Sequence, residues 1–282
     1  MKIARIIFIS LSLLSTTAFS YGAETNNARH EDELQLGIGP AFVLLPDYPG
    51  SKHTKAWPVP LPYLNYQGRH FSLNREEIAW NFNSQGAWHG SVSINGLPPV
   101  ERKHTKNVSN IDQTRDTTLE IGPSLIYDFN SRWQAQVAVR QVIGTDLARW
   151  QLVGWRFNPK IAYAWPSTET PDQGTQWEFT FSSLWNSAAY NDYFYQVSAP
   201  ATPIYDATSG YGGSYLSVKY RYREKAWLWS AYLRAQTLDQ ATFADSPLVE
   251  TKTAVTFGVA AIWIGYQKPL QSLLRHFNNP SL

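Results

Sequence analysis

The sequence of 282 residues carries 24 Lys and Arg against 22 Asp and Glu, a formal net charge of +2, and contains no cysteine. This charge balance offers no argument for a nucleic-acid partner, and without cysteine neither a disulfide framework nor a cysteine-linked lipid anchor can form. Charged residues are only 16% of the chain and aromatic residues 15%, whereas soluble domains average about 25% charged residues, so the composition is typical of a surface that meets lipid on one side and water on the other.

The first twenty residues have the pattern of a secretory signal peptide. Lys2 and Arg5 precede a short apolar stretch, residues 6–14, and Ala18-Phe19-Ser20 is a small-x-small cleavage site. The apolar stretch is too short to cross a bilayer as a helix. We therefore expect residues 1–20 to be a signal peptide cleaved after Ser20, with cleavage after Ala23 as the alternative. No later stretch approaches the length of a membrane-spanning helix, which excludes a helical membrane protein.

The second expected strand contains an unusual run of prolines. After a first strand that begins near Leu34, residues 57–66 read as extended chain but contain Pro58, Pro60 and Pro62. Proline has no N–H to donate to a ladder and is confined to edges or bulges of sheets. We therefore expect this segment to be edge-like or only partly bonded to its neighbours.

Three long runs in the middle of the chain carry the clearest signal. Polar and apolar residues alternate along 118–129, 133–140 and 153–165, and Trp and Tyr recur at the ends of these runs. Alternation with period two predicts strands with one apolar and one polar face. Ordinary soluble strands have about 5–6 residues, whereas strands that cross a membrane in a β-barrel need roughly 9–11. The runs therefore predict an all-β fold, a transmembrane antiparallel β-barrel.

The lengths of the connections predict the number of strands. Outer-membrane barrels alternate short turns on one side with long loops on the other, and bacterial single-chain barrels have even strand counts. The alternation holds throughout only if residues 69–83 cross twice, which gives twelve strands, with ten as the fallback. We expect the barrel to occupy residues 21–266, followed by a tail at 267–282. A secreted β-sandwich also has alternating strands, but the length of these strands favours the barrel. The expected long loops are 46–54, 97–116, 143–151, 187–211 and 239–252.

Catalytic and metal sites are not indicated. None of the six His has the spacing of a metal motif, and no cysteine can join them. His89 and Ser91 lie two residues apart, so they share one face of a strand and could serve a lipid hydrolase at the barrel rim. A nucleophile and its base need a third, orienting group, and no third member is recognisable. We therefore expect no catalytic residue, no metal and no cofactor, and a protein that is not an enzyme.

Charged residues on the polar faces are expected to line the barrel interior. They could form a weakly anion-selective pore, because rings of charge set selectivity. They could instead form a network of paired charges that fills a narrow barrel, and this second reading is favoured because twelve strands enclose a limited bore. The candidates are Glu120, Arg140, Arg156, Lys160, Glu178, Lys219, Arg221 and Arg234.

The long loop after residue 186 is rich in aromatic side chains. Tyr supplies rigid amphipathic contact area for recognition, so these residues could form a binding surface. They could equally form the outer aromatic girdle and a loop folded into the barrel mouth, and both readings stay open. The candidates are Tyr190, Tyr193, Phe194, Tyr195, Tyr205 and Tyr211.

Three segments resemble the MipA/OmpV family of Gram-negative outer-membrane proteins, the family of MltA-interacting protein. They are Gly37–Pro40 with Pro46-Asp47-Tyr48-Pro49-Gly50-Ser51 and the proline run, then 190–197 with 205–213, then 245–249. The resemblance implies an outer-membrane barrel in contact with lipid. Its best-known member joins a lytic transglycosylase to a peptidoglycan synthase, so a murein hydrolase and a peptidoglycan synthase become the expected partners. A small-solute channel is the alternative, and a rim lipid hydrolase a weaker one.

Overall fold

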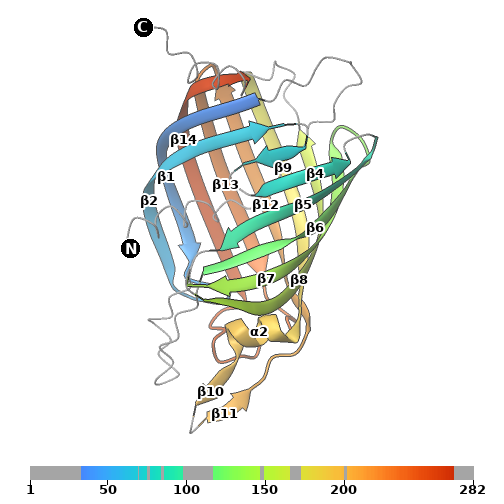
Figure 1. The fold of residues 1–282 in the computed structure, drawn as a ribbon. Helices are drawn as coiled ribbons and strands as arrows, with labels where there is room; N and C mark the ends of the chain where they lie inside the picture. The colour runs from blue at the N-terminus through green and yellow to red at the C-terminus, as the bar shows by residue number, and fades with distance from the viewer. Residues whose placement is uncertain are drawn as a thin grey trace.

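The computed structural model describes residues 33–68, 70–74, 77–83, 86–97, 117–146, 149–165, 173–199 and 202–269. These residues form a closed antiparallel barrel in the order β1-β14-β13-β12-β9-β8-β7-β6-β5-β4-β3-β2 (Figure 1). The prediction of a twelve-stranded barrel is therefore confirmed, and residues 69–83 cross twice, as β3 and β4. The barrel strands are β1 (Glu33–Pro46), β2 (Thr54–Gln67), β3 (Phe71–Leu73), β4 (Ile78–Asn83), β5 (Trp88–Leu97), β6 (Thr117–Asp128), β7 (Trp133–Thr145), β8 (Trp150–Trp165), β9 (Gln173–Asn186), β12 (Gly210–Glu224), β13 (Trp227–Thr237) and β14 (Thr253–Pro269).

The long connection between β9 and β12 has its own secondary structure, which the sequence did not predict. It contains the helix α2 (Ala188–Tyr195) and a small hairpin of β10 (Val197–Ala199) and β11 (Thr202–Tyr205). The last strand also differs from its expected boundary, because it continues to Pro269, three residues beyond Tyr266. The expected signal peptide and most of the expected tail, residues 270–282, lie outside the described residues.

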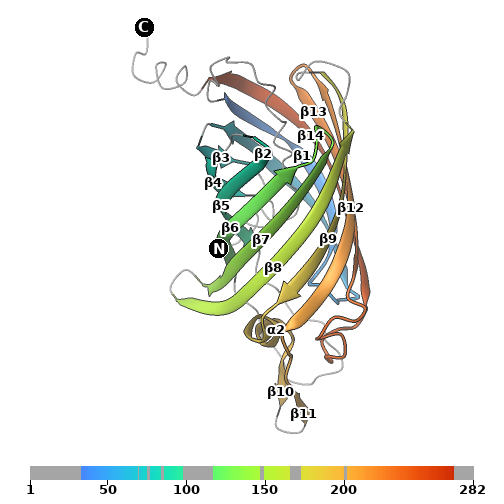
Figure 2. The same ribbon diagram turned by 90° about the vertical axis from the view of Figure 1, so that its right-hand side faces the viewer.

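The two ends of the barrel differ in their connections. Glu33 at the start of β1 stands opposite Pro269 at the end of β14, so both chain ends of the barrel lie at one rim. The connections β2–β3, β4–β5, β6–β7, β8–β9 and β12–β13 return at this end, which we call the turn rim. At the opposite end, the loop rim, α2 and the β10–β11 hairpin project beyond the strands (Figure 2). Short turns mark the periplasmic side of outer-membrane barrels.

The outer face of the barrel is apolar. Every second side chain of each strand points outward, and these outward side chains are the apolar members of the alternation. The outward side chains include Phe82 on β4 and Leu152 on β8, which are 61% and 72% exposed. Aromatic rings pair along this face where the strands meet the turn rim, as in the interface girdles of membrane barrels. The ring pairs and their centroid distances are Trp88–Tyr127 at 4.5 Å, Trp133–Tyr163 at 4.9 Å and Trp177–Tyr220 at 4.7 Å. In the described part of the chain, no helix is long and apolar enough to cross a membrane.

The proline-rich strand is only partly bonded, as predicted. β2 pairs with β1 along its whole length, from Thr54 to Gln67. On its other edge, the register with the three-residue strand β3 comprises Tyr66 and Gln67 among the residues that the structure describes. Figure 2 shows the short strands β3 and β4 beside β2. The barrel is thus closed through a narrow contact at the turn rim.

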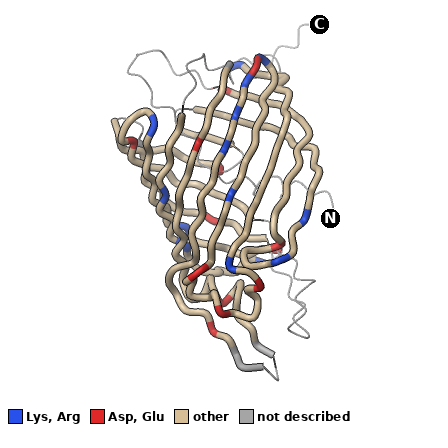
Figure 3. Tube along the Cα trace, turned by 180° about the vertical axis from the view of Figure 1, so that it is seen from behind, with Lys and Arg blue, Asp and Glu red and all other residues tan. Residues whose placement is uncertain are grey.

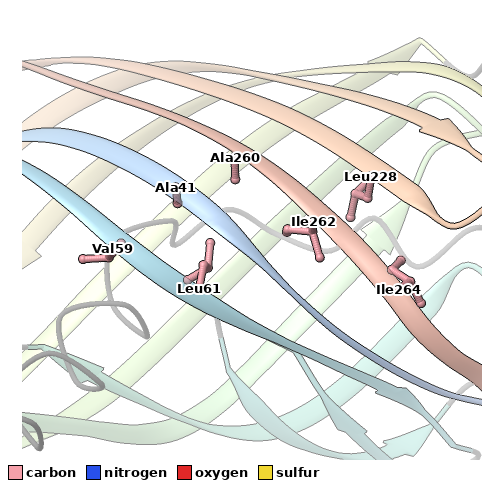
Figure 4. Packing of buried hydrophobic residues seen from close by; sticks show 7 residues of the cluster. All are labelled: Ala41, Val59, Leu61, Leu228, Ala260, Ile262 and Ile264. Atoms are coloured by element: carbon pink, nitrogen blue, oxygen red, sulfur yellow. The ribbon is translucent and has the colours of Figure 1, made fainter.

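The inner face of the barrel has two unlike walls. Strands β5 to β9 and β12 present polar and charged side chains inward. Figure 3 shows lysines and arginines spread along the length of the barrel. Strands β1, β2 and β14, with one residue of β13, instead present an apolar cluster, which we call the apolar wall (Figure 4). The apolar wall consists of Ala41, Val59, Leu61, Leu228, Ala260, Ile262 and Ile264, with Trp57 and Tyr63 packed against it.

Candidate functional site

Three loops fuse into one packed layer at the loop rim. We call this layer the cap and define it as residues 47–53, 187–199, 202–209 and 238–252. The Tyr48 hydroxyl donates to the carbonyl of Leu248 at 3.0 Å, and the Tyr195 hydroxyl donates to the carbonyl of Pro49 at 3.2 Å. The Ser246 hydroxyl donates to the carbonyl of Tyr195 at 2.7 Å. Segments two hundred residues apart in the chain are therefore joined by a direct hydrogen bond.

An aromatic core stabilises the cap. The rings of Tyr195 and Phe243 stack with centroids 3.8 Å apart and planes 7° from parallel. Phe243 is only 1% exposed and packs with Leu238 and Ala241 in the same cluster. Burial of apolar and aromatic surface of this kind is a main stabilising term for such an assembly of loops. The cap is therefore a small folded unit of its own.

Asn191 of α2 organises the polar part of the cap. Its side chain is fully buried and accepts a hydrogen bond from the Asn186 amide at 2.9 Å. Its own amide donates to the carbonyl of Thr208 at 2.7 Å and to the Thr242 hydroxyl at 3.1 Å. Because a buried amide is costly unless its bonding capacity is used, this arrangement holds the end of β9, the loop before β12 and the loop after β13 in one position.

Helix α2 lies against β8 because two local features permit it. Ser187 caps the helix, and its hydroxyl accepts from the backbone N–H of Tyr190 at 3.2 Å. Gly154 on β8 has a φ of +145°, and a Cβ there would lie 2.7 Å from the backbone nitrogen of Tyr190. Only glycine fits both that φ and that spacing. The Tyr190 ring is consequently buried against Val142 and Val153 inside the barrel mouth.

Tyr190 also contacts a charged side chain of the barrel interior. The guanidinium carbon of Arg156 lies 5.1 Å from the centre of the Tyr190 ring, within range of a cation–π contact. Burial raises the pKa of the Tyr190 hydroxyl to about 12, an effect that Arg156 opposes and Glu120 adds to. Burial and the nearby carboxylates of Asp245 and Asp192 also raise the pKa of Tyr205 in the cap.

The raised pKa of Tyr190 predicts an alkaline limit to cap stability. Since the pKa in the closed cap lies near 12 and that of a free tyrosine near 10, the closed cap disfavours the phenolate. The stabilisation is fully present below about pH 10 and is lost as the pH rises towards 12, by roughly 2–3 kcal/mol. Near-UV circular dichroism of the refolded protein between pH 9 and 12 should show a smaller alkaline change in Tyr190→Phe than in the wild type. Tyr220→Phe on the barrel exterior should match the wild type, and an unchanged alkaline profile in Tyr190→Phe would contradict the prediction.

Two arginines lie side by side on adjacent strands of the polar wall, and each is paired with its own carboxylate. Arg140 on β7 stands directly opposite Arg156 on β8. The Arg156 guanidinium lies 2.5 Å from the Glu120 carboxylate, and that of Arg140 lies 3.1 Å from Glu77 and 2.7 Å from the Ser93 hydroxyl. Facing like charges are destabilising unless they are compensated. Glu77 was not among the lumen-facing residues predicted from the sequence, because nothing in the local pattern shows that the β3–β4 turn reaches the interior.

The remaining lumen candidates lie along the same wall. Glu178 on β9 and Lys219 on β12 are register partners and both are buried. Lys160 and Arg221 are half-buried. The Arg234 guanidinium lies over the ring of Tyr215 at 4.3 Å. All eight residues proposed from the sequence thus alternate with apolar or aromatic side chains of the outer face, and several are engaged in pairs or ring contacts.

The aromatic loop candidates are mostly interior residues of the cap. Tyr190 and Tyr195 are buried, while Tyr193, Phe194, Tyr205 and Tyr211 are half-buried. The Tyr205 hydroxyl donates to the carbonyl of Thr242 at 3.2 Å, and Tyr211 forms a 2.7 Å hydrogen bond with the Ser214 hydroxyl. Their largest contribution in this structure is packing within the cap.

The hydrolase candidates do not form a nucleophile–base pair. A ring nitrogen of His89 lies 2.7 Å from the Asp128 carboxylate, which also accepts from the Gln134 amide at 2.8 Å. Ser91 is buried opposite Ser124, and no hydrogen bond joins it to His89. The partner Asp128 could have been found from the alternation in β6, which places it on the inner face. Within the described ranges, no three His, Cys, Asp or Glu side chains gather as metal ligands would.

Comparison with known proteins adds a family and several remote structural likenesses. The family model of MltA-interacting protein MipA matches residues 38–264. No curated protein matches the chain in sequence. The CymD monoaromatic hydrocarbon channel is similar at 10% identity with a TM-score of 0.37, over 93% of this chain and 97% of that chain. A Pseudomonas aeruginosa FadL homologue is similar at 7% identity with a TM-score of 0.37, over 84% and 91%. At TM-scores this low, the structural similarity gives no information about what the chain does.

Proposed function

The chain belongs to the MltA-interacting protein MipA family, and from this membership we propose that it is a non-enzymatic scaffold of the Gram-negative outer membrane. It would hold peptidoglycan-remodelling enzymes, a lytic transglycosylase and a peptidoglycan synthase, on the periplasmic side. The family match over residues 38–264 is the observation that carries this proposal. The barrel supplies the membrane anchor, and its turn rim, which faces the periplasm if short turns do, supplies the docking surface.

The barrel interior favours a scaffold over an open channel. Glu120, Arg140, Glu178 and Lys219 are buried, although they point into the lumen. The charges in a water-filled pore would be hydrated, whereas Arg140 and Arg156 are engaged by Glu77 and Glu120. The cap is packed at the loop rim, and Tyr190 of the cap is buried there against Val142 and Val153. These features support a barrel that acts as a scaffold through its outer surfaces and not as an open channel.

Charge reversal at the two rims tests the proposal. Arg132 and Lys225 are exposed in short turns of the turn rim, and Lys252 is exposed in the cap. Full-length protein is immobilised in vesicles and exposed to a purified MltA-type lytic transglycosylase. We expect Arg132→Glu and Lys225→Glu to weaken capture by several-fold, because they place repulsive charge at the docking surface. Lys252→Glu at the opposite rim is the matched control and should capture like the wild type. Failure of the wild type to capture the enzyme would remove the scaffold proposal.

The segment after β14 provides a second docking element in this proposal. Removing residues 270–282 leaves every residue of β14 in place. If this segment takes part in docking, the shortened protein should capture less of the enzyme while its barrel still migrates as a folded species on a gel without heating. Equal capture by the shortened protein would restrict docking to the turns.

A further inference from the structure

Strand β12 carries a file of cationic side chains on the inner face of the barrel. Lys219, Arg221 and Arg223 occupy alternate positions of the strand, so all three point to the same side as the buried Ser217. Lys219 is buried, whereas Arg221 and Arg223 are half-buried. β12 ends at the end of the barrel opposite α2 (Figure 2). The two arginines therefore lie on the inner face close to the turn rim.

The outer two members of this file have neighbours that engage them. Lys219 stands directly opposite Glu178 of β9. The Arg223 guanidinium donates to uncharged oxygens, which bind it without compensating its charge. These acceptors are the backbone carbonyl of Lys225 at 3.0 Å and the side-chain oxygens of Gln267 at 2.6 Å and Gln35 at 3.5 Å.

Arg221, between them, has a different surrounding. Its cross-strand neighbours on the inner face are Gln176 of β9 and Ser230 of β13, both uncharged and half-buried. In the part of the chain that the structure describes, the side chains of these three residues make no hydrogen bond and no ion pair. A guanidinium has five N–H donors, an amide two and a hydroxyl one. We call Gln176, Arg221 and Ser230 the donor row.

The charge of Arg221 is the uncompensated one on this side of the lumen. Arg140 and Arg156 lie 3.1 Å and 2.5 Å from the carboxylates of Glu77 and Glu120. Arg221 instead has a like charge at the next inward position on either side, each roughly 7 Å away along the strand. Neighbouring charges of one sign add to a local potential that attracts counter-ions, and a partly buried charge is costly without a partner. The donor row therefore favours an anion.

The shape of the donor row fits an oxyanion. A guanidinium presents a planar fork that binds carboxylate or phosphate through two parallel hydrogen bonds. Neighbouring strands lie about 4.8 Å apart, so the long side chain of Gln176 can donate to the same anion from one flank. Ser230 is short and leaves the other flank uncovered. The next inward position of β9 towards the turn rim is Gly174, which has no side chain to cover the row.

We propose that the donor row is a binding site for the carboxylate or phosphate group of a small solute that enters from the turn rim. Arg221 holds two oxygens of the anion, the Gln176 amide donates to it from the side, and the charges of Lys219 and Arg223 strengthen the attraction. This activity goes beyond the capture of murein enzymes and does not depend on it, because the site lies inside the barrel and not on the turns.

Protection of Arg221 from an arginine reagent tests the site. Full-length protein is refolded in detergent micelles, which leave both rims accessible, and treated with phenylglyoxal. Sodium chloride, sodium phosphate or sodium acetate is added at one ionic strength, and the modification rate of each arginine is mapped by mass spectrometry. In chloride Arg221 should react, and phosphate or acetate should slow its modification by several-fold. Arg132, exposed in the β6–β7 turn, is the control and should react equally in all three salts.

Each outcome of this experiment bears on the proposal. Slowing by phosphate alone assigns the site to phosphorylated solutes, and slowing by acetate assigns it to carboxylates. Equal rates at Arg221 in all three salts would overturn the proposal, and so would equal slowing at Arg132, which would show an adventitious ion only. Absence of reaction at Arg221 in chloride would also overturn it, since the guanidinium would then be engaged by the protein itself.

A variant pair ties the protection to the donor row. Gln176→Leu removes the flanking amide, so several-fold more phosphate or acetate should be needed to protect Arg221. Gln236→Leu is the matched control, because Gln236 is a half-buried inward glutamine at the other end of β13, and it should behave like the wild type.

Equilibrium dialysis with the radiolabelled form of the protecting anion gives a readout without the reagent. Arg221→Gln should lose binding and Arg132→Gln should keep it, with folding of both checked by migration on a gel without heating. Equal binding by Arg221→Gln and the wild type would overturn the proposal.

Discussion

Replacing Phe243 with alanine is expected to open the cap while the barrel remains folded. The ring is 1% exposed and stacks on Tyr195 at 3.8 Å. Truncation of a buried phenylalanine costs about 3–5 kcal/mol, because contacts are lost and a cavity remains. The cap has no strand ladder to the barrel wall that could absorb such a loss. This cluster and the buried Asn191 both join segments of the cap that are far apart in the chain.

Amide hydrogen exchange measures this effect segment by segment. In Phe243→Ala, residues 188–195 and 238–249 should lose protection by several orders of magnitude, whereas β6 and β7 keep the exchange rates of the wild type. Phe82→Ala is the matched control, since it removes the same ring from the exposed outer face of β4. Unchanged protection of the cap in Phe243→Ala would show that the aromatic stack does not stabilise it.

The second large effect is expected from Glu120→Gln in the polar wall. Arg156 would keep its charge but lose its carboxylate at 2.5 Å, while still facing Arg140 across the strand pair. Breaking a buried pair by removing one partner costs about 3–5 kcal/mol, because the remaining charge is left without compensation. The free energy of unfolding, measured by urea titration of the barrel in vesicles, should fall by about that amount.

Two further variants isolate the cause. Glu120→Gln combined with Arg156→Met removes both charges and should restore most of the lost stability. Asp245→Asn is the control for loss of a carboxylate, because Asp245 is 92% exposed and lies 3.7 Å from Lys252, and surface pairs contribute little. Equal losses in Glu120→Gln and Asp245→Asn would mean that the interior pair is not a structural requirement.

The sequence did not show that the three segments resembling the MipA/OmpV family come together in space. Residues 46–51, 190–213 and 245–249 each look like ordinary loops. In the structure Tyr48 bonds to Leu248, and Tyr195 bonds to Pro49 and Ser246. Contacts over such separations depend on how the strands order the loops around the rim, which no local pattern encodes. For the same reason α2 and the β10–β11 hairpin were expected only as loop.

The sequence by itself determined the barrel. Period-two alternation over long runs, aromatic residues at strand ends and the alternation of short and long connections were enough for the fold class and the twelve strands, because strand geometry fixes which face each residue occupies. The prolines of β2 similarly predicted a partly unpaired strand. Only the tertiary structure decided which polar groups meet, such as Glu77 with Arg140. It also decided where the pairing between β4 and β5 ends. Those contacts join strands and turns distant in the chain, and their geometry arises from closure of the barrel, not from any single segment.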